Sequence, residues 1–336
     1  MPTYQLANLE KALESDSSFI LEKSPNNKTA LSWWVSAKRT RSYPFARVYD
    51  TLNFSGKKVT IIPVIKDEGF EGCRDFLQWD TISLMSLLGV FVIISYYHGA
   101  KRNENYDNKI TEQRFDINHI KEQLEKLCSY QSDALHWNLE QAENVPNLGK
   151  KAISAYQKIS KKLDVRMHSS DIALKKIQTI TEGKDAFMKV SRNLAKQAQH
   201  RESITIQPKE KLSGSKGMIT IKNYLGGHYY FTSDEIEFKN DKIILIEAKH
   251  SQSNHLPSSE DIKDGLVKMI LFANLKDAKI NSTKYETKAQ LKLTSEKAFQ
   301  VDRLNDSQKQ ILQLLKEEAK TNNFEIKIND QILELA

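Results

Sequence analysis

The stretch SDEIEFKNDKIILIEAKHS (residues 233–251) places charged side chains at the end of an apolar run. Ile243–Ile246 is β-branched and leucine-rich, which predicts a buried strand, and the KND before it predicts a tight turn. We therefore expect a hairpin. Because side chains alternate along a strand, Glu247 and Lys249 share one face. The hairpin should also bring Asp234 towards Glu247.

Two converging carboxylates form a hard oxygen site of the kind that suits Mg²⁺, which also keeps water molecules and substrate phosphate as ligands. A lysine beside them can orient or help to deprotonate an attacking water and can offset charge on a phosphate. The metal ion would lower the pKa of the water and stabilise negative charge on the phosphoryl oxygens. Such a set of groups suits phosphodiester hydrolysis.

The pattern S-D-x12-E-A-K, with hydrophobic residues before E-A-K, resembles the signature of the PD-(D/E)xK nuclease superfamily, which includes most type II restriction endonucleases. Ser233 stands where proline is usual, and the resemblance covers about residues 218–295. It implies a mixed-sheet, restriction-endonuclease-like core with flanking helices. For the site it implies three Mg²⁺ ligands and one catalytic lysine: Asp234, Glu247, the carbonyl of Ala248, and Lys249.

Three neighbouring residues are secondary candidates. Glu237 is a candidate auxiliary acid, although alternation along the strand places it on the opposite face from Asp234. His250 and Gln252 lie just beyond the lysine and could touch substrate phosphate, or they could be solvated loop residues. The alternative for the whole motif is an edge hairpin whose Glu247 and Lys249 form a surface ion pair of little energetic value.

Composition indicates a globular protein with an anionic partner. The chain has 336 residues, enough for one large or two ordinary domains, and 39% hydrophobic content is too high for a disordered chain. The net charge of +7 favours nucleic acid as that partner. Cys73 and Cys128 are too few for a disulfide framework and suit a reducing cytoplasm.

We expect an α/β (α+β) protein in three parts: an N-terminal α/β part (1–107), a helical basic middle (108–202) and the catalytic part (203–336). The strand signal disappears from about residue 108 to 202. In the catalytic part, apolar patterns predict helices and strands in alternation. The predicted strands are 218–224, 228–238, 241–249, 284–295 and 324–330, and the predicted helices are 258–275 and 307–322.

The N-terminal part shows a helical start at residues 6–13, a buried strand at 57–67 and an amphipathic helix at 74–89. The apolar run 81–97 is at the short limit for a membrane span. Gly89 divides it into helix-forming and β-branched halves, so we interpret it as a helix end, a turn and a buried strand.

This part repeats the order of the C-terminal motif, with Asp50 and Lys66 16 positions apart and Asp234 and Lys249 15 positions apart. Val64 stands where a glutamate would be needed, so the similarity is either coincidental α/β geometry or a decayed copy. A nearby acidic cluster is a rival location for a metal ion: Asp67, Glu68, Glu71, Asp75 and Asp80.

The segment 33–49 interleaves cations with aromatic residues, a pattern typical of nucleic-acid contacts. A basic loop with a few core aromatics is an equal alternative. The candidate DNA contacts are Lys38, Arg39, Arg41 and Arg47.

The sequence therefore favours a cytoplasmic, Mg²⁺-dependent endonuclease that cuts double-stranded DNA at a specific site, as a homodimer with no membrane association. One alternative is another PD-(D/E)xK nuclease, in repair or phage defence. A second is a non-catalytic DNA-binding protein, whose binding would depend steeply on salt. A membrane-associated regulator built on residues 81–97 is a more distant alternative.

Overall fold

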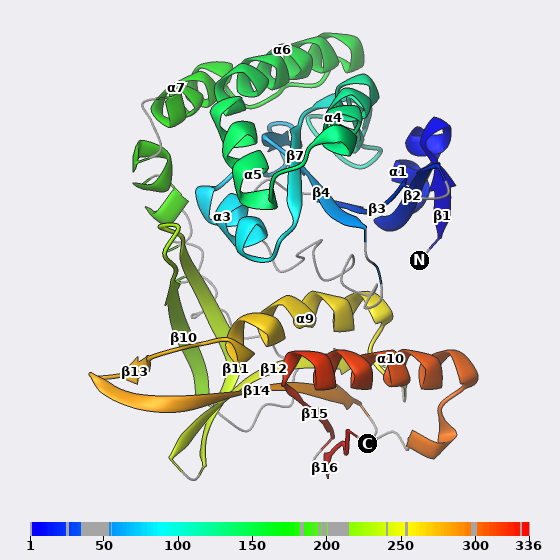
Figure 1. Ribbon diagram of the computed structural model, residues 1–336. Helices are drawn as coiled ribbons and strands as arrows, with labels where there is room; N and C mark the ends of the chain where they lie inside the picture. Colours follow the sequence, from blue (N-terminus) through cyan, green and yellow to red (C-terminus); the bar gives the residue numbers. More distant parts are fainter. Residues whose placement is uncertain are drawn as a thin grey trace. The chain divides into compact units, whose positions relative to one another are not determined.

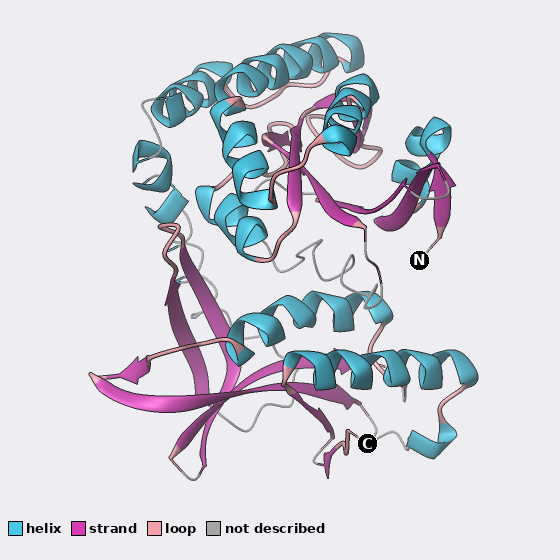
Figure 2. Ribbon diagram, viewed as in Figure 1, coloured by secondary structure: helices cyan, strands magenta, loops and turns pink. Residues whose placement is uncertain are grey.

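The computed structural model describes a mixed α+β protein with mixed sheets, which confirms the expected fold class (Figures 1 and 2). The described residues are 2–24, 27–34, 54, 56–181, 185–189, 191–193, 196, 200, 215–239, 241–252, 255–296, 301–329 and 331–335. The chain forms two compact units: residues 1–194 with 223–227, and residues 195–222 with 228–336. The helices of the basic middle thus belong to the same unit as the N-terminal strands.

The first unit contains a mixed sheet with the strand order β1-β2-β3-β4-β7 and two short antiparallel pairs, β5 with β6 and β8 with β9. The strands are β1 (Thr3–Gln5), β2 (Ser18–Ser24), β3 (Asn27–Trp33), β4 (Lys57–Pro63), β5 (Ile65–Asp67), β6 (Arg74–Phe76), β7 (Phe91–Ser95), β8 (Tyr97–Arg102) and β9 (Ile110–Phe115). The helices are η1 (Leu6–Asn8), α1 (Leu9–Ser15), α3 (Trp79–Leu87), α4 (Ile117–Ser129), α5 (Ala134–Glu143), α6 (Val145–Leu163) and α7 (Ser170–Thr181).

Helix α5 covers the outer edge of β7, the last strand of this sheet. Asn138 Oδ1 accepts the backbone N–H of Val92 at 2.7 Å, and Gln141 Oε1 accepts that of Ile94 at 3.2 Å. Trp137 Nε1 donates to the Val92 carbonyl at 2.7 Å. Side chains of α5 therefore form hydrogen bonds with backbone N–H and C=O groups of β7 that a further strand would otherwise pair. This protects the edge of the sheet.

The interpretation of residues 81–97 is confirmed, because α3 ends at Leu87, Gly89 adopts a φ of 67° and β7 begins at Phe91. A positive φ favours glycine, which has no Cβ to clash. Among the described residues, no helix has the length and apolar character needed to cross a bilayer.

Three sequence-based expectations for this unit were wrong in detail. The helix expected at 74–89 starts only at Trp79, after strand β6, and it is not amphipathic, since residues 79–85 are all buried. The strand expected at 57–67 is divided between β4 and β5. The region from residue 108 contains strand β9. The helical start expected at residues 6–13 is confirmed as η1 and α1, which follow strand β1 and precede strand β2.

The second unit is built on a mixed sheet with the order β10-β11-β12-β14-β15-β16, in which β13 pairs with β14. Its strands are β10 (Ser215–Lys222), β11 (His228–Lys239), β12 (Lys242–Ser251), β13 (Ala278–Ile280), β14 (Thr283–Ser295), β15 (Glu325–Ile328) and β16 (Gln331–Ile332). Its helices are α9 (Ser259–Ala273), η2 (Val301–Arg303) and α10 (Asp306–Asn322).

Strands β10, β11 and β12 run antiparallel in succession, whereas β12, β14 and β15 are parallel neighbours. Helices α9 and α10 connect the parallel strands and lie side by side on one face of the sheet (Figure 1). The elements expected here are confirmed within one or two residues at most ends. Ser258 caps α9 as expected, since its Oγ accepts the N–H of Asp261 at 3.1 Å.

A fully buried ion pair lies on the sheet face opposite to Glu247. Lys292 Nζ of β14 donates to Glu235 Oε1 of β11 at 2.8 Å, and both residues are almost inaccessible to solvent. Pairing is needed here because an isolated buried charge is strongly unfavourable. The pair therefore links two strands that are separated by β12.

We predict that Lys292→Met destabilises the protein by about 3–5 kcal/mol, because it leaves the Glu235 carboxylate buried without its ammonium. The double variant Glu235→Leu/Lys292→Met should recover most of this loss. Urea unfolding followed by circular dichroism measures both. The control is Lys284→Met, which breaks the exposed Lys284–Asp277 ion pair of the same unit. An equal loss of stability in Lys292→Met and Lys284→Met would contradict the account.

Candidate functional site

The cluster around Glu247 lies between strand β12 and helix α9. Glu247 follows the apolar part of β12, and its side chain is buried. Its Oε1 accepts a hydrogen bond from Lys249 Nζ at 2.8 Å, and its Oε2 accepts one from Lys268 Nζ at 2.6 Å. Lys249 shares the strand face with Glu247, as expected, whereas Lys268 comes from α9. Each oxygen of this buried carboxylate thus has a positive partner.

Helix α9 contributes residues that the sequence analysis missed. Lys268 Nζ also donates to the Thr232 carbonyl at 3.0 Å, so it joins the helix to β11 as well as to β12. Asp264, one turn earlier, adds negative potential at Lys249. Asp264 and Lys268 are four residues apart in the sequence, so they are expected on the same face of the helix. This spacing does not show which strand that face packs against.

Gly265 allows this close packing of α9 on the strands. A Cβ at this position would lie 3.0 Å from Leu291 Cδ1 and 3.3 Å from Lys249 Cε. Both distances are shorter than ordinary van der Waals contact, so a larger residue would push the helix away from Glu247 or displace Lys249. The glycine therefore sets how closely the helix approaches the charged cluster.

Asp234 lies at an irregularity in β11, where the register with β10 shifts between the pairs Ser215–Ile236 and Gly217–Ser233. Such bulges change the direction of side chains and are common beside active sites. The Asp234 Oδ2 accepts the backbone N–H of Ala248 at 2.8 Å. The N–H and C=O of one strand residue point towards the same neighbour, so the Ala248 carbonyl also faces β11.

Ser233, which stands where the resemblance has proline, holds the strands together at this point. Its Oγ accepts the Ile246 N–H at 3.0 Å and lies 2.8 Å from the Ile246 carbonyl. The structure thus brings together the residues that the motif predicts: Asp234, Glu247, Ala248 and Lys249.

The ion pairs fix the protonation of the central residues. Burial alone would raise the pKa of Glu247, but the ammonium groups of Lys268 and Lys249 outweigh it and lower the pKa to about 2. Burial alone would lower the pKa of Lys249, but the Glu247 carboxylate outweighs it and raises the pKa. Both side chains are therefore charged at neutral pH.

The secondary candidates lie outside this cluster. Glu237 pairs with Ile244 across the β11–β12 ladder, so it lies on the opposite face of the sheet from Glu247. His250 Nδ1 is 3.0 Å from Thr294 Oγ1, and Gln252 is exposed beyond the end of β12. The candidate DNA contacts Lys38, Arg39, Arg41 and Arg47, and also Asp50, lie outside the described residues.

The acidic cluster of the first unit (Asp67, Glu68, Glu71, Asp75 and Asp80), which lies within the described residues, does not form a metal-binding group. Glu68 pairs with Lys66 at 2.6 Å, Glu71 Oε2 accepts the Asn108 N–H at 2.6 Å, and Asp80 Oδ2 accepts from a serine hydroxyl at 3.0 Å. Throughout the described part of the chain, no group of three or more His, Cys, Asp or Glu side chains is placed to hold a metal ion.

The chemistry of the donors around Asp234 fits Mg²⁺. Two carboxylates and a carbonyl supply only oxygen, and Mg²⁺ is commonly held by one or two carboxylates, with water and substrate phosphate as its other ligands. A metal ion at Glu247 would replace Lys249 or Lys268 on one oxygen. The residues that would hold it are Asp234, Glu247 and Ala248.

Comparison with protein-family models, with curated proteins and with solved structures finds no match for this chain. The interpretation of the site therefore depends on its own geometry and on the motif.

We predict a pH-dependent difference in stability between the wild type and Glu247→Gln, measured in EDTA. The pKa of Glu247 falls from an ordinary 4.5 to about 2 on folding, so the charged carboxylate stabilises the folded state above pH 4.5, and this contribution is lost as the pH falls towards 2. The pH-dependent part is about 3 kcal/mol. Urea unfolding at pH values from 8 to 2 measures it, and a difference that stays flat below pH 4.5 would contradict the prediction.

Proposed function

We propose that this protein is a Mg²⁺-dependent endonuclease that hydrolyses phosphodiester bonds in double-stranded DNA at a specific sequence, in the manner of a type II restriction enzyme. The observation that carries the proposal is the meeting of Asp234, Glu247 and Lys249 at one point of the second sheet. A pair of carboxylates with an adjacent lysine, on neighbouring strands, is the arrangement that the PD-(D/E)xK resemblance implies.

The strand order of the second unit supports the same assignment. Three antiparallel strands, a helix and a parallel strand occur in the order β10, β11, β12, α9 and β14, with the three-residue strand β13 between α9 and β14. This order agrees with the mixed-sheet, restriction-endonuclease-like core implied by the resemblance, with the aspartate on the second strand and E-x-K on the third. We assign the core on that basis.

The roles of the residues follow from their charges and positions. Asp234, Glu247 and the Ala248 carbonyl would hold Mg²⁺, which when bound supplies activation of a water and charge neutralisation at the phosphate. Lys249 presents an ammonium group beside them, which can orient the water and offset the negative charge that develops on the phosphoryl oxygens. Lys268 positions Glu247 by holding its Oε2.

Cleavage of both strands requires two such sites, so we propose that the active species is a homodimer on a symmetric DNA site. Sedimentation of the protein with and without a duplex would determine the stoichiometry. The positive net charge of the chain supports DNA as the substrate. The same site would also serve a repair or phage-defence nuclease, which would cut without requiring a short defined sequence.

One observation favours a second candidate, a DNA-binding protein without cleavage activity. Each carboxylate oxygen of Glu247 accepts a hydrogen bond from a lysine. If Lys268 stayed bonded to Oε2, it would hinder the binding of a metal ion to that oxygen. Such a protein would bind DNA with a steep salt dependence and would leave it intact in the presence of Mg²⁺.

We predict that the wild-type protein cuts plasmid or phage DNA into discrete fragments with Mg²⁺ and leaves it intact with EDTA. Asp234→Asn and Lys249→Met should each lower the cleavage rate by about 10²-fold or more, since each removes a group that acts on the transition state. Rates are measured by gel electrophoresis under single-turnover conditions.

The matched control is Asp277→Asn, which removes an exposed carboxylate of the same unit and should cut at the wild-type rate. Binding without cleavage on both methylated and unmethylated DNA would favour the second candidate. Cleavage that persists in both site variants would refute the proposed active site.

A further inference from the structure

The first unit contains a cavity of about 540 Å³ that the proposed nuclease chemistry does not use. It lies between the β5–β6 pair and helices α6 and α7, and its volume is in the range of small-molecule binding sites. Its polar lining includes Asp67, Arg74, Lys161, His168, Ser169 and Ser170.

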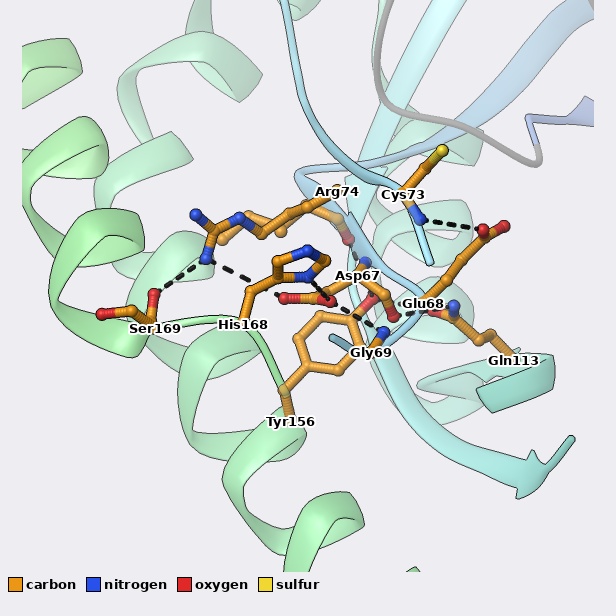
Figure 3. Close-up of polar contacts among 10 residues, drawn as sticks. Asp67, Glu68, Gly69, Cys73, Arg74, Gln113, Tyr156, His168 and Ser169 are labelled. Carbon is orange, nitrogen blue, oxygen red and sulfur yellow. Dashed lines mark hydrogen bonds and ion pairs between the residues drawn. The ribbon is translucent and has the colours of Figure 1, made fainter. Parts of the chain in front are cut away.

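A buried carboxylate fixes the histidine of this cavity. Asp67 is buried, and its Oδ1 accepts the Gly69 N–H at 2.9 Å and lies 2.8 Å from His168 Nδ1 (Figure 3). Because a carboxylate only accepts hydrogen bonds, the ring donates through Nδ1. The Asp67 carboxylate thus sets the orientation of the His168 ring, and Nε2 is the ring nitrogen that can contact a ligand.

The backbone of Asp67 is held by a second layer of hydrogen bonds (Figure 3). Tyr156 Oη accepts the Asp67 N–H at 2.9 Å and donates to Gln113 Oε1 at 2.7 Å. Gln113 Nε2 donates to the Asp67 carbonyl at 2.9 Å. Burial raises the pKa of Tyr156 well above its ordinary value, so the phenol keeps its proton. The Asp67–His168 pair is thus preorganised by residues of α6 and β9.

Two cations and a helix end give the cavity a positive side. Arg74 Nη1 donates to the Ser169 carbonyl at 2.8 Å and lies 4.0 Å from Asp67 Oδ2, which fixes the guanidinium at the wall. Lys161 lines the cavity from α6. Ser170 begins the twelve-residue helix α7, whose dipole also favours an anion at this end.

We propose that this cavity binds a phosphate group, which His168 Nε2, Arg74 and Lys161 contact. Arginine and lysine supply charge-assisted donors to phosphate oxygens. Nε2 can accept from a phosphate hydroxyl, or it can donate to a phosphate oxygen once the ring is protonated. Apolar side chains on the remaining wall, Ile65, Ile153 and Ala173, leave a surface for the organic part of the ligand.

The phosphate can belong to a free mononucleotide or to a nucleic-acid strand, and the test separates these sources. The background is the full-length protein with Asp234→Asn, which removes the proposed cleavage without touching the first unit. Adenosine 5′-monophosphate is titrated by calorimetry, and a fluorescent DNA duplex is titrated by anisotropy at fixed salt. This cavity can therefore be tested whether or not the protein is a nuclease.

Two substitutions of His168 separate ligand binding from a structural role. His168→Asn keeps an N–H near the Nδ1 position, facing Asp67, and loses Nε2. His168→Gln keeps a nitrogen near the Nε2 position and loses the contact with Asp67. We predict that His168→Asn unfolds within about 2 °C of its parent but binds the phosphate ligand at least tenfold more weakly. His168→Gln should be less stable and should retain more of the binding.

Mononucleotide binding that weakens in His168→Asn identifies a free nucleotide as the ligand. DNA binding that weakens in this variant, without mononucleotide binding, identifies a strand phosphate. The proposal is overturned if the parent binds neither probe, or if His168→Asn binds both as tightly as the parent does. A variant His168→Asn that loses stability and keeps its binding would show a structural role alone.

Discussion

The second unit depends on one buried carboxylate, that of Glu247, which lies between the ammonium groups of Lys249 and Lys268. A carboxylate at this depth is strongly unfavourable unless it is paired and hydrogen-bonded. Lysines from β12 and α9 supply both partners. Lys268 also donates to Thr232 of β11, so a single charge network determines how the helix lies on two strands.

The same network is the basis of the proposal that this site binds a phosphate and a cation. Four charged residues meet there, two acidic and two basic, namely Asp234, Glu247, Lys249 and Lys268. Each lysine can exchange an oxygen of Glu247 for a phosphate oxygen and so remain paired. The arrangement also limits substitution, since removing one member leaves another buried charge without compensation.

The sequence predicted the elements that have strong local signals. The apolar run of β12 is followed at once by Glu247 and Lys249, and the capping serine Ser258 marks the start of α9. These features depend on alternation, helical periodicity and capping, which are local properties. The approach of Asp234 to Glu247 was expected from the hairpin, because its turn fixes the register, whereas Ala248 was expected only from the family resemblance.

Other features depend on packing between distant segments and have no local signal. Lys268 meets Glu247 only because Gly265 lets α9 approach the strands closely. His168 meets Asp67 across 101 residues of chain. Strands β1, β2, β3 and β9 have mixed patterns of burial, and their pairing with neighbours outweighs weak propensities. Strand β6 was missed because three residues are too few to show alternation.

A crystal structure of the protein with duplex DNA and Ca²⁺ would test the central claim most directly, because Ca²⁺ takes carboxylate and carbonyl oxygens as ligands at well-defined distances. The account predicts a cation about 2.3–2.6 Å from carboxylate oxygens of both Asp234 and Glu247, with a DNA phosphate beside Lys249. DNA bound elsewhere, with Glu247 still held by both lysines and no cation between the carboxylates, would contradict it.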